Sequence, residues 1–289
     1  MSRAREVARV RVTVLGASGF IGRRLCAALR ARGDAVVEAS LRDPAGAAKA
    51  SADSNVVVNL AGAPVSVRWT RASQGAMTSS RVDLPRRYLT ALKAIEDRPR
   101  RYVSASAIGY YGTSRDATFV EASPPGDDFL AHLCVAWEAV ADEAAALGMR
   151  VAKVRTGLVL GPEGGVLAKL LPLFRLGLGG VVADGNQWYS WIHVDDQVGI
   201  YLHAIDGADG AFNATAPKPV TNRDFTRALA RAVHRPAILP VPAFGPKLLL
   251  GEGALIVNQG QRVLPQRTLS SGYVFRHPDL AEALSSLVT

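Results

Sequence analysis

The stretch Gly16-Ala17-Ser18-Gly19-Phe20-Ile21-Gly22 decides the fold of this chain of 289 residues. It follows the alternating run Val10-Arg11-Val12-Thr13-Val14-Leu15, which predicts a strand, and it leads into a helical pattern with Leu25, Ala28 and Leu29 on one face. Glycine reaches backbone conformations that a side chain would block, and a bare backbone lets a pyrophosphate approach the amides of the next helix. The stretch therefore predicts a strand, a tight turn and a helix that bind a dinucleotide.

The elements predicted at the start of the chain are typical of a doubly wound α/β fold with a parallel sheet. A strand from Val10 to Leu15, a helix from Ile21 to Arg32 and a strand from Ala35 to Leu41 form its opening βαβ unit. Arg42 lies just past the second strand, where such folds meet the adenosine ribose. An arginine there suits a ribose 2′-phosphate, so the sequence favours NADP(H) over NAD(H); a solvated surface arginine is the alternative.

The segment between Leu41 and Asn55 is too short for two crossovers and a strand, because each crossover takes roughly 10 to 12 residues or more. We therefore expect the third strand, at the sheet edge, to be missing or reduced, which would open the adenine pocket. The next strand, Asn55 to Leu60, ends in the bend Asn59-Leu60-Ala61-Gly62. Its small residues can lie against a nucleotide.

The rest of the chain alternates strands and helices and then changes character. The predicted elements are a helix over 74–92 interrupted by Pro85, a strand over 101–105, a helix over 129–147, a strand over 151–159 and a helix over 167–176. Asp195 or Asp196 is expected to cap a helix that runs to His203. We predict a flexible N-terminus (1–9), a dinucleotide-binding domain (10–165) and a C-terminal substrate lobe or lid with strands and helices that return to the sheet (166–289).

Composition excludes several classes of function. Hydrophobic residues make up 48% of the chain, no apolar run approaches the roughly 20 residues of a membrane span, and the first residues lack a signal-peptide core, so we expect a cytoplasmic protein. The two cysteines, Cys26 and Cys134, have no metal-ligand spacing. The net charge of +9 comes from dispersed basic residues, which favours anionic small molecules over nucleic acid.

Together these segments resemble an atypical short-chain dehydrogenase/reductase subgroup with an NAD-dependent epimerase/dehydratase-like Rossmann domain. The stretches that carry the resemblance are Asn59-Leu60-Ala61-Gly62, Arg68-Trp69, Ser80-Arg81, Gly109-Tyr110-Tyr111-Gly112, Trp137-Glu138, Arg155-Thr156-Gly157, 172–180, 191–196 and Gly260-Gln261-Arg262. The resemblance implies a C-terminal domain of unknown function from about Val241, and a possible homodimer. The residues expected to contact the dinucleotide are Gly16, Ser18, Gly19, Phe20, Ile21, Gly22, Arg42, Leu60, Ala61, Gly62 and Thr156.

Active members of this superfamily use a Tyr-x-x-x-Lys pair, and this pair is absent here. The helix that should carry it reads Cys134-Val135-Ala136-Trp137-Glu138. Cys134 and Glu138 share a helix face and become candidates for acid/base work, with a buried thiol and a salt-bridged carboxylate as the structural alternatives. Tyr110 or Tyr111 could supply the missing proton, with a core aromatic pair as the structural alternative, and Ser106 could polarise the substrate oxygen.

The substrate side is expected to involve Arg68, Tyr111, Trp188 and Tyr189, with a place in the core as the alternative for Trp188 and Tyr189. Arg68 and Arg81 could reach an anionic group near the nicotinamide end, or each could pair with acidic surface residues. Aromatic residues stand where relatives that act on nucleotide sugars place an arginine against the diphosphate. The sequence therefore argues against a nucleotide sugar as the substrate. His193 is expected to be a hydrogen-bonded structural residue.

Three functions stay open from the sequence. The first is an NADP(H)-dependent oxidoreductase or epimerase acting on a small molecule. The second is a non-redox cyclase, isomerase or lyase on the same fold, and the third is a nucleotide-responsive binding protein without turnover.

Overall fold

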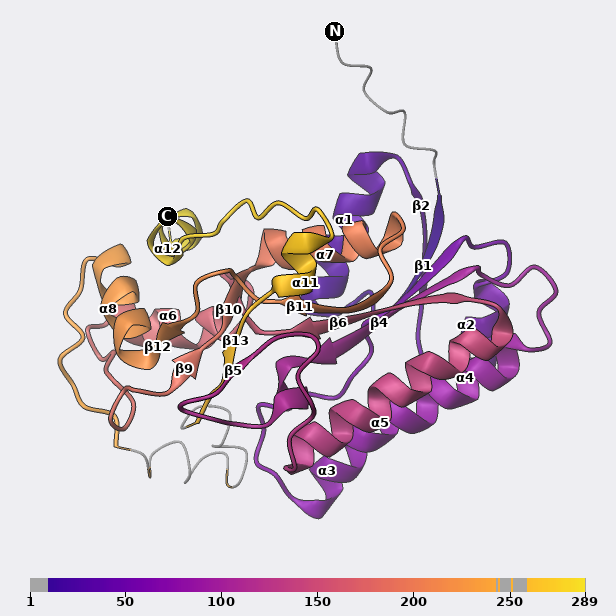
Figure 1. The fold of residues 1–289 in the computed structure, drawn as a ribbon. Helices are drawn as coiled ribbons and strands as arrows, with labels where there is room; N and C mark the ends of the chain where they lie inside the picture. Colours follow the sequence, from indigo (N-terminus) through magenta and orange to yellow (C-terminus); the bar gives the residue numbers. More distant parts are fainter. Residues whose placement is uncertain (1–9, 243, 245–250, 252–258, 289) are drawn as a thin grey trace, which may run out of the picture.

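The centre of the molecule is a six-stranded parallel sheet (Figure 1). The computed structural model describes residues 10–242, 244, 251 and 259–288. The strands of the sheet are β1 (Arg11–Leu15), β2 (Ala35–Ala39), β3 (Val56–Asn59), β4 (Arg101–Ala107), β6 (Arg150–Thr156) and β11 (Gly210–Ala214). They lie in the order β11-β6-β4-β3-β1-β2, and every neighbouring pair is parallel. The doubly wound parallel sheet predicted from the sequence is confirmed.

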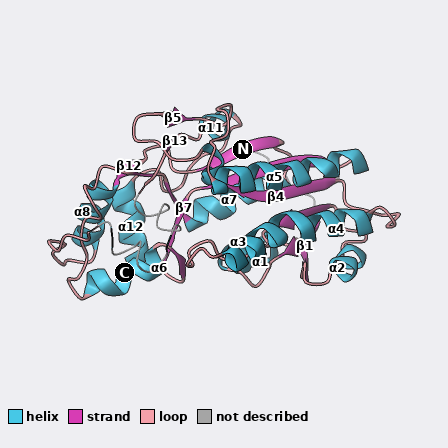
Figure 2. Ribbon diagram, turned by 90° about the horizontal axis from the view of Figure 1, so that it is seen from below, coloured by secondary structure: helices cyan, strands magenta, loops and turns pink. Residues whose placement is uncertain are grey.

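Helices cover both faces of this sheet, as parallel strands buried on both sides require (Figure 2). One face packs against α1 (Phe20–Arg32) and α7 (Val194–Ile205). The other packs against α2 (Pro44–Ala50), α4 (Leu84–Leu92) and α5 (Phe129–Glu143).

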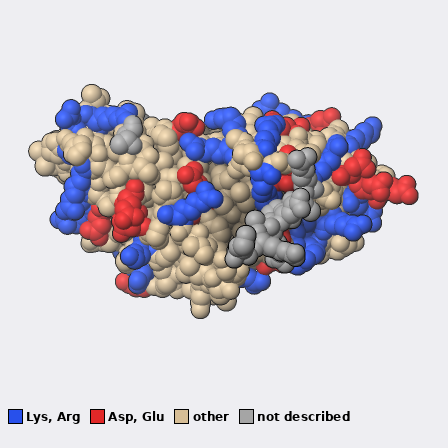
Figure 3. All heavy atoms as spheres, turned by 90° about the horizontal axis from the view of Figure 1, so that it is seen from above, with Lys and Arg blue, Asp and Glu red and all other residues tan. Residues whose placement is uncertain are grey.

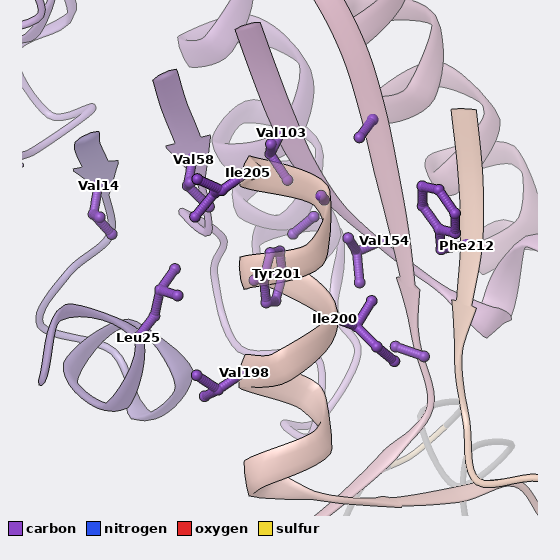
Figure 4. Close-up of a cluster of buried hydrophobic side chains, with 14 of the residues drawn as sticks. Val14, Leu25, Val58, Val103, Val154, Val198, Ile200, Tyr201, Ile205 and Phe212 are labelled. Atoms are coloured by element: carbon purple, nitrogen blue, oxygen red, sulfur yellow. The ribbon is translucent and has the colours of Figure 1, made fainter. Parts of the chain in front are cut away.

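The strands supply the two cores by alternation. In β1, Val14 joins the core under α1 and α7, whereas the next residue, Leu15, joins the core on the opposite face. Figure 4 shows the first core, in which side chains of α7 such as Tyr201 lie beside the strand valines Val58 and Val103. This packing fixes the carboxyl ends of the strands, where the candidate site lies.

The strand that would lie outside β2 is missing from the described residues. α2 connects β2 directly to β3, and β3 pairs with β1 on the side away from β2. Asp43 begins α2 by accepting a hydrogen bond from the Gly46 amide at 3.0 Å. Because residues 41–55 contain only this one short helix, the prediction of a reduced sheet edge is confirmed.

The helix predicted over 74–92 is continuous, and Pro85 changes its geometry without ending it. It comprises α3 (Arg71–Thr78), the π-helical turn η1 (Ser79–Asp83) and α4. Pro85 has no N–H and its ring would clash with the carbonyl four residues earlier, on Arg81. The backbone widens just before the proline, where the Leu84 N–H donates to the Ser79 carbonyl.

The strand predicted over 151–159 is two strands, because the chain changes partner at Gly157. β6 pairs in the main sheet, whereas β7 (Leu158–Gly161) pairs with β10 (Trp191–His193) in a small second sheet. A Cβ on Gly157 would lie 2.5 Å from the Ser190 carbonyl oxygen, so only glycine permits this crossing.

A smaller lobe with its own buried cluster lies beside the sheet (Figure 1). It contains α6 (Leu167–Arg175), α8 (Asn222–Ala232) and α12 (Leu280–Val288), with the short strands β8 (Gly164–Gly165), β9 (Trp188–Tyr189) and β12 (Val220–Thr221). The short strands β5 (Thr118–Phe119) and β13 (Arg262–Val263) pair with each other, and α11 (Gln266–Ser270) lies near β11. Among the described residues, no helix is both long enough and apolar enough to cross a membrane. The predicted flexible segment 1–9 lies outside the described residues.

His193 caps α7, which corrects the prediction that Asp195 or Asp196 does so. The His193 Nδ1 accepts the Asp195 amide N–H at 3.0 Å. Asp196 instead accepts hydrogen bonds from Tyr273 and from the Arg276 and His277 amides, all in the C-terminal segment. The histidine imidazole is an acceptor only while this nitrogen is unprotonated.

Acidification is therefore expected to destabilise the protein through His193. Burial, with the neighbouring His277, lowers the pKa of His193 from 6.5 to about 4, although Asp195 and Asp196 oppose this shift. Since the unfolded chain binds this proton first, the stability from the neutral ring is complete above pH 6.5 and is lost as the pH falls toward 4. The loss is on the order of 3 kcal/mol. Urea unfolding at pH 7.5 and 4.5 should show a steeper loss for the wild type than for His193→Asn; equal losses would contradict this role.

Candidate functional site

A cavity of about 460 Å³ lies at the carboxyl ends of β1, β3, β4 and β6. Its walls come from the glycine turn after β1, the bend after β3, residues 105–109 at the end of β4 and residues 156–158 at the end of β6. Ligands of open parallel sheets bind at this edge, where successive crossovers go to opposite faces. The cavity is therefore the candidate site.

The glycine turn is shaped by backbone contacts that exclude side chains. Gly16 has a φ of +84°, and a Cβ there would lie 2.9 Å from the Ala61 amide nitrogen. A Cβ on Gly22 would lie 2.3 Å from the Gly16 carbonyl oxygen. Gly19 begins α1 and offers no side chain to cap it, so the first amides of α1 are left for a ligand. The turn has the form of an anion-binding helix start.

The bend after β3 lies directly against this turn. The Asn59 side-chain oxygen accepts the Ala61 amide N–H at 3.1 Å, which holds the bend. Leu60 and Gly62 line the cavity, whereas Ala61 contacts Gly16 behind it. Thr156 lines the cavity from the end of β6 and accepts a hydrogen bond from Gln197.

Arg42 lies three residues beyond β2, on the exposed surface and outside the cavity lining. The Gly16 amide donates to the Ala39 carbonyl at 3.3 Å, so the end of β2 is next to the glycine turn. Arg42 makes no ion pair with any residue in the described part of the chain. Its charge is thus near the turn and free for an anion.

Cys134 lies on the face of α5 that lines the cavity, together with Leu130, Leu133 and Trp137. Burial, with the nearby charge of Glu138, raises the pKa of the Cys134 thiol to about 12. The thiol is therefore protonated at neutral pH, which is the state a proton donor needs. Ser106, at the end of β4, also lines the cavity.

Glu138 does not line the cavity, and its carboxylate is already occupied. It accepts two hydrogen bonds from Arg155, at 2.7 and 2.8 Å, and a third from the Ser106 hydroxyl at 2.7 Å. Both ionic side chains are buried, that of Arg155 being 5% exposed and that of Glu138 7% exposed. This geometry assigns Glu138 the salt-bridged role that the sequence left as an alternative, and it makes Glu138 a support for Ser106.

Tyr110 and Tyr111 pack around the same arginine, away from the cavity lining. The Arg155 guanidinium carbon lies 3.5 Å from the centroid of the Tyr110 ring. The Tyr111 hydroxyl donates to Asn213 at 2.7 Å and accepts from Arg155 at 2.9 Å. The structure therefore places neither tyrosine among the residues that line the cavity.

Trp188, Tyr189 and Ser190 close the opposite side of the cavity with residues 259–261 of the C-terminal segment. Gln261 donates to the Ile108 carbonyl at 2.9 Å, and the Ser190 hydroxyl donates to the Gln261 carbonyl at 2.8 Å. These bonds tie the C-terminal segment to the end of β4. The predicted substrate lobe thus supplies one wall of the site.

Of the predicted site residues, the cavity brings together Gly16, Gly19, Phe20, Ile21, Gly22, Leu60, Gly62, Ser106, Cys134, Thr156, Trp188 and Tyr189. It is not lined by Ser18, Arg42, Ala61, Arg68, Tyr110, Tyr111 or Glu138. The sequence reasoning missed Leu130, Trp137 and Gln261 as lining residues. The i, i+4 spacing of Leu130 and Cys134 was the available signal for the first, because both fall on one helix face.

The surface charges do not form a single basic patch on the face drawn in Figure 3, where Lys and Arg are interspersed with Asp and Glu. Several exposed arginines pair with carboxylates, such as Arg30 with Glu38 and Arg86 with Glu143. Inside the cavity, Arg81 is the one cation among the described lining residues.

Two family models match the chain. The NAD dependent epimerase/dehydratase family matches residues 12–214, and a domain of unknown function (DUF1731) matches residues 241–287, where the resemblance placed the C-terminal domain. The chloroplastic epimerase family protein SDR39U1 homolog of Arabidopsis thaliana is 38% identical over 308 residues, which cover 99% of this chain and 88% of that protein. Human epimerase family protein SDR39U1 is 36% identical over 293 residues, which cover 96% and 100%.

Solved structures agree with these matches. The crystal structure of human SDR39U1 with NADPH has a TM-score of 0.89 to this chain at 34% identity, covering 96% of this chain and 99% of that one. UDP-glucose 4-epimerase of Thermotoga maritima, solved with UDP-glucose, has a TM-score of 0.79 at 18% identity and covers 96% and 97%. The second likeness shows a shared fold.

Proposed function

The chain belongs to the NAD dependent epimerase/dehydratase family, and from this premise we propose that it is an NADP(H)-dependent oxidoreductase or epimerase acting on a small molecule. The observation that carries the proposal is a single cavity that begins at the glycine turn and continues to Cys134 and Ser106. The proposed dinucleotide site and the proposed proton donor would thereby lie in one space.

The residues present fit a dinucleotide. Gly16 and Gly22 leave room that a Cβ would fill, and the uncapped start of α1 presents amides toward an anion. These residues would hold the pyrophosphate. Thr156 and Leu60 would contact the cofactor farther along the cavity.

Arg42 supports NADP(H) over NAD(H). Its exposed guanidinium follows β2, the strand that meets the adenosine ribose in this fold, and a guanidinium suits the 2′-phosphate. The NADPH in the human relative's structure supports the same choice. Because the described part of the chain has no strand outside β2, an adenine bound there would lie on the open surface.

At the end of the cavity away from the glycine turn, the reaction requires a proton donor. The usual tyrosine and lysine are absent, so another residue must take this role. A bound NADP(H) supplies a hydride donor or acceptor. Cys134 is the titratable residue on the cavity face of α5, and its protonated Sγ holds the proton that a developing alkoxide would take. The Ser106 hydroxyl donates its proton to Glu138, so its oxygen is left to accept a hydrogen bond from a substrate hydroxyl. The walls around Leu130, Leu133 and Trp137 are mostly apolar and would displace water from a substrate bound against them.

Replacing Arg42 by aspartate is expected to reverse the cofactor preference. Calorimetric titration should show that the wild type binds NADPH roughly 10- to 100-fold more tightly than NADH, since one charge-assisted phosphate contact is worth about 1.5–3 kcal/mol. Arg42→Asp should reverse this preference, because a carboxylate repels the phosphate and accepts from a ribose hydroxyl. Arg227→Asp makes the same charge change at an exposed position of α8 and should leave the preference for NADPH intact. Equal NADPH and NADH affinities in the wild type would refute the assignment of Arg42.

A further inference from the structure

Arg81 is brought into the cavity wall by an unusual piece of backbone. It belongs to the π-helical turn η1, which widens the helix between α3 and α4 ahead of Pro85. The side chain is 9% exposed and lies against the bend after β3. A Cβ on Gly62 would be 2.9 Å from the Arg81 Nη2, so glycine at this position makes room for the guanidinium.

The Arg81 charge has no carboxylate partner among the described residues. Its hydrogen bonds are long ones, to the Met77 carbonyl at 3.4 Å and to the Ser80 hydroxyl at 3.5 Å. The other two buried arginines differ, because Arg101 pairs with Asp209 at 2.6 Å and Arg155 pairs with Glu138 at 2.7 Å. A buried cation without an anion is costly unless something else compensates for it.

The indole N–H of Trp137, beside Arg81, is a second hydrogen-bond donor that lacks an acceptor. The Arg81 guanidinium carbon is 4.9 Å from the centroid of the Trp137 ring. Trp137 is 6% exposed, and its Nε1 is buried without a hydrogen-bond partner. The other three indole N–H groups each donate to a backbone carbonyl, those of Val65, Arg115 and Lys218. Trp137 is thus the exception among the four tryptophans.

From these observations we infer that Arg81 and Trp137 form an anion-binding subsite for a carboxylate or phosphate oxygen inside the cavity. The inference rests on the proposed function, because it concerns a ligand of the same cavity. Both side chains are donors only, and together they offer a positive charge and an N–H at one place in an apolar wall. The subsite adjoins Cys134, so it would hold the ligand's charged group next to the proton donor.

Two sources of the anion have the same chemistry. One is a phosphate of the dinucleotide, and the other is a carboxylate of the small-molecule substrate. Indole N–H resonances of the ¹⁵N-labelled full chain can separate them, with the Trp137 signal assigned by Trp137→Phe. Sodium acetate, inorganic phosphate and NADPH serve as probes at constant ionic strength. The indoles of Trp69 and Trp191, which do not line the cavity, are internal controls for folding and for nonspecific salt effects.

We expect acetate, phosphate or NADPH to shift the Trp137 resonance in a saturable way while the Trp69 and Trp191 resonances stay in place. Arg81→Gln should weaken this response about tenfold or more, and Arg81→Lys should restore part of it. If acetate still shifts the Trp137 resonance when NADPH is saturating, the anion is a carboxylate of the small-molecule substrate. If NADPH shifts the resonance and blocks acetate, the anion is the dinucleotide phosphate.

The subsite is refuted if none of the three probes moves the Trp137 resonance, or if Arg81→Gln responds as the wild type does. Failure of the proposed function has a different signature. In that case calorimetry detects no NADPH binding, while acetate still shifts the Trp137 signal.

Discussion

Replacing Glu138 by glutamine is expected to lower the free energy of unfolding by about 3–5 kcal/mol. The substitution keeps the shape of the side chain but leaves the Arg155 charge buried without its anion. Burial alone lowers the pKa of Arg155, and the hydrogen bonds and charge of Glu138 more than reverse this, so the guanidinium stays charged in the folded protein. Denaturant unfolding followed by circular dichroism measures the change.

Glu143→Gln is the matched control on the same helix. Glu143 pairs with Arg86 at 2.9 Å, but both side chains are almost half exposed. Solvent screens such a pair, so its loss should cost no more than about 1 kcal/mol. If Glu138→Gln were as mild as Glu143→Gln, the buried pair would not be the structural anchor that we describe, and Glu138 would again be a candidate for acid/base chemistry.

Replacing Gly22 by alanine is expected to lower NADPH affinity by roughly 100-fold. The new Cβ would lie 2.3 Å from the Gly16 carbonyl oxygen and 2.8 Å from the Ala17 carbonyl oxygen, so the turn itself must move. Both obstacles are backbone atoms, which cannot swing aside as a side chain would. The same strain should lower the free energy of unfolding by about 1–3 kcal/mol.

Gly75→Ala controls for a glycine-to-alanine change in a helix. No heavy atom lies within 4 Å of its new Cβ, and Gly75 is exposed in α3. This variant should gain up to about 1 kcal/mol of stability and bind NADPH as the wild type does. Wild-type NADPH affinity in Gly22→Ala would show that the cofactor does not use the glycine turn.

The sequence predicts the fold well where a local pattern and a physical constraint agree. The alternation over Val10–Leu15 and the glycines after it predict β1 and α1 within one residue. The short segment after Leu41 correctly predicts the missing edge strand, because chain length limits what can fit. The π-helical turn before Pro85 and the change of strand partner at Gly157 are harder to predict from the sequence. Each depends on how the backbone packs against a neighbouring element.

The site is less predictable because its residues meet through tertiary contacts. Cys134 and Ser106 follow from helix spacing and a strand end, and both line the cavity. The partner of Glu138 does not follow, since Arg155 comes from a different strand and the pairing is set by the sheet. Cap geometry is also hidden: His193 is an acceptor here only because its ring stays neutral, whereas aspartate is the usual choice.

The central claim is that an NADP(H) molecule binds at the glycine turn of the cavity. Calorimetric titration of the full wild-type chain with NADPH, and in parallel with NADH, tests it most directly. The account predicts saturable binding of one NADPH per chain, with weaker binding of NADH. The absence of binding heat for both nucleotides, confirmed by equilibrium dialysis, would contradict it.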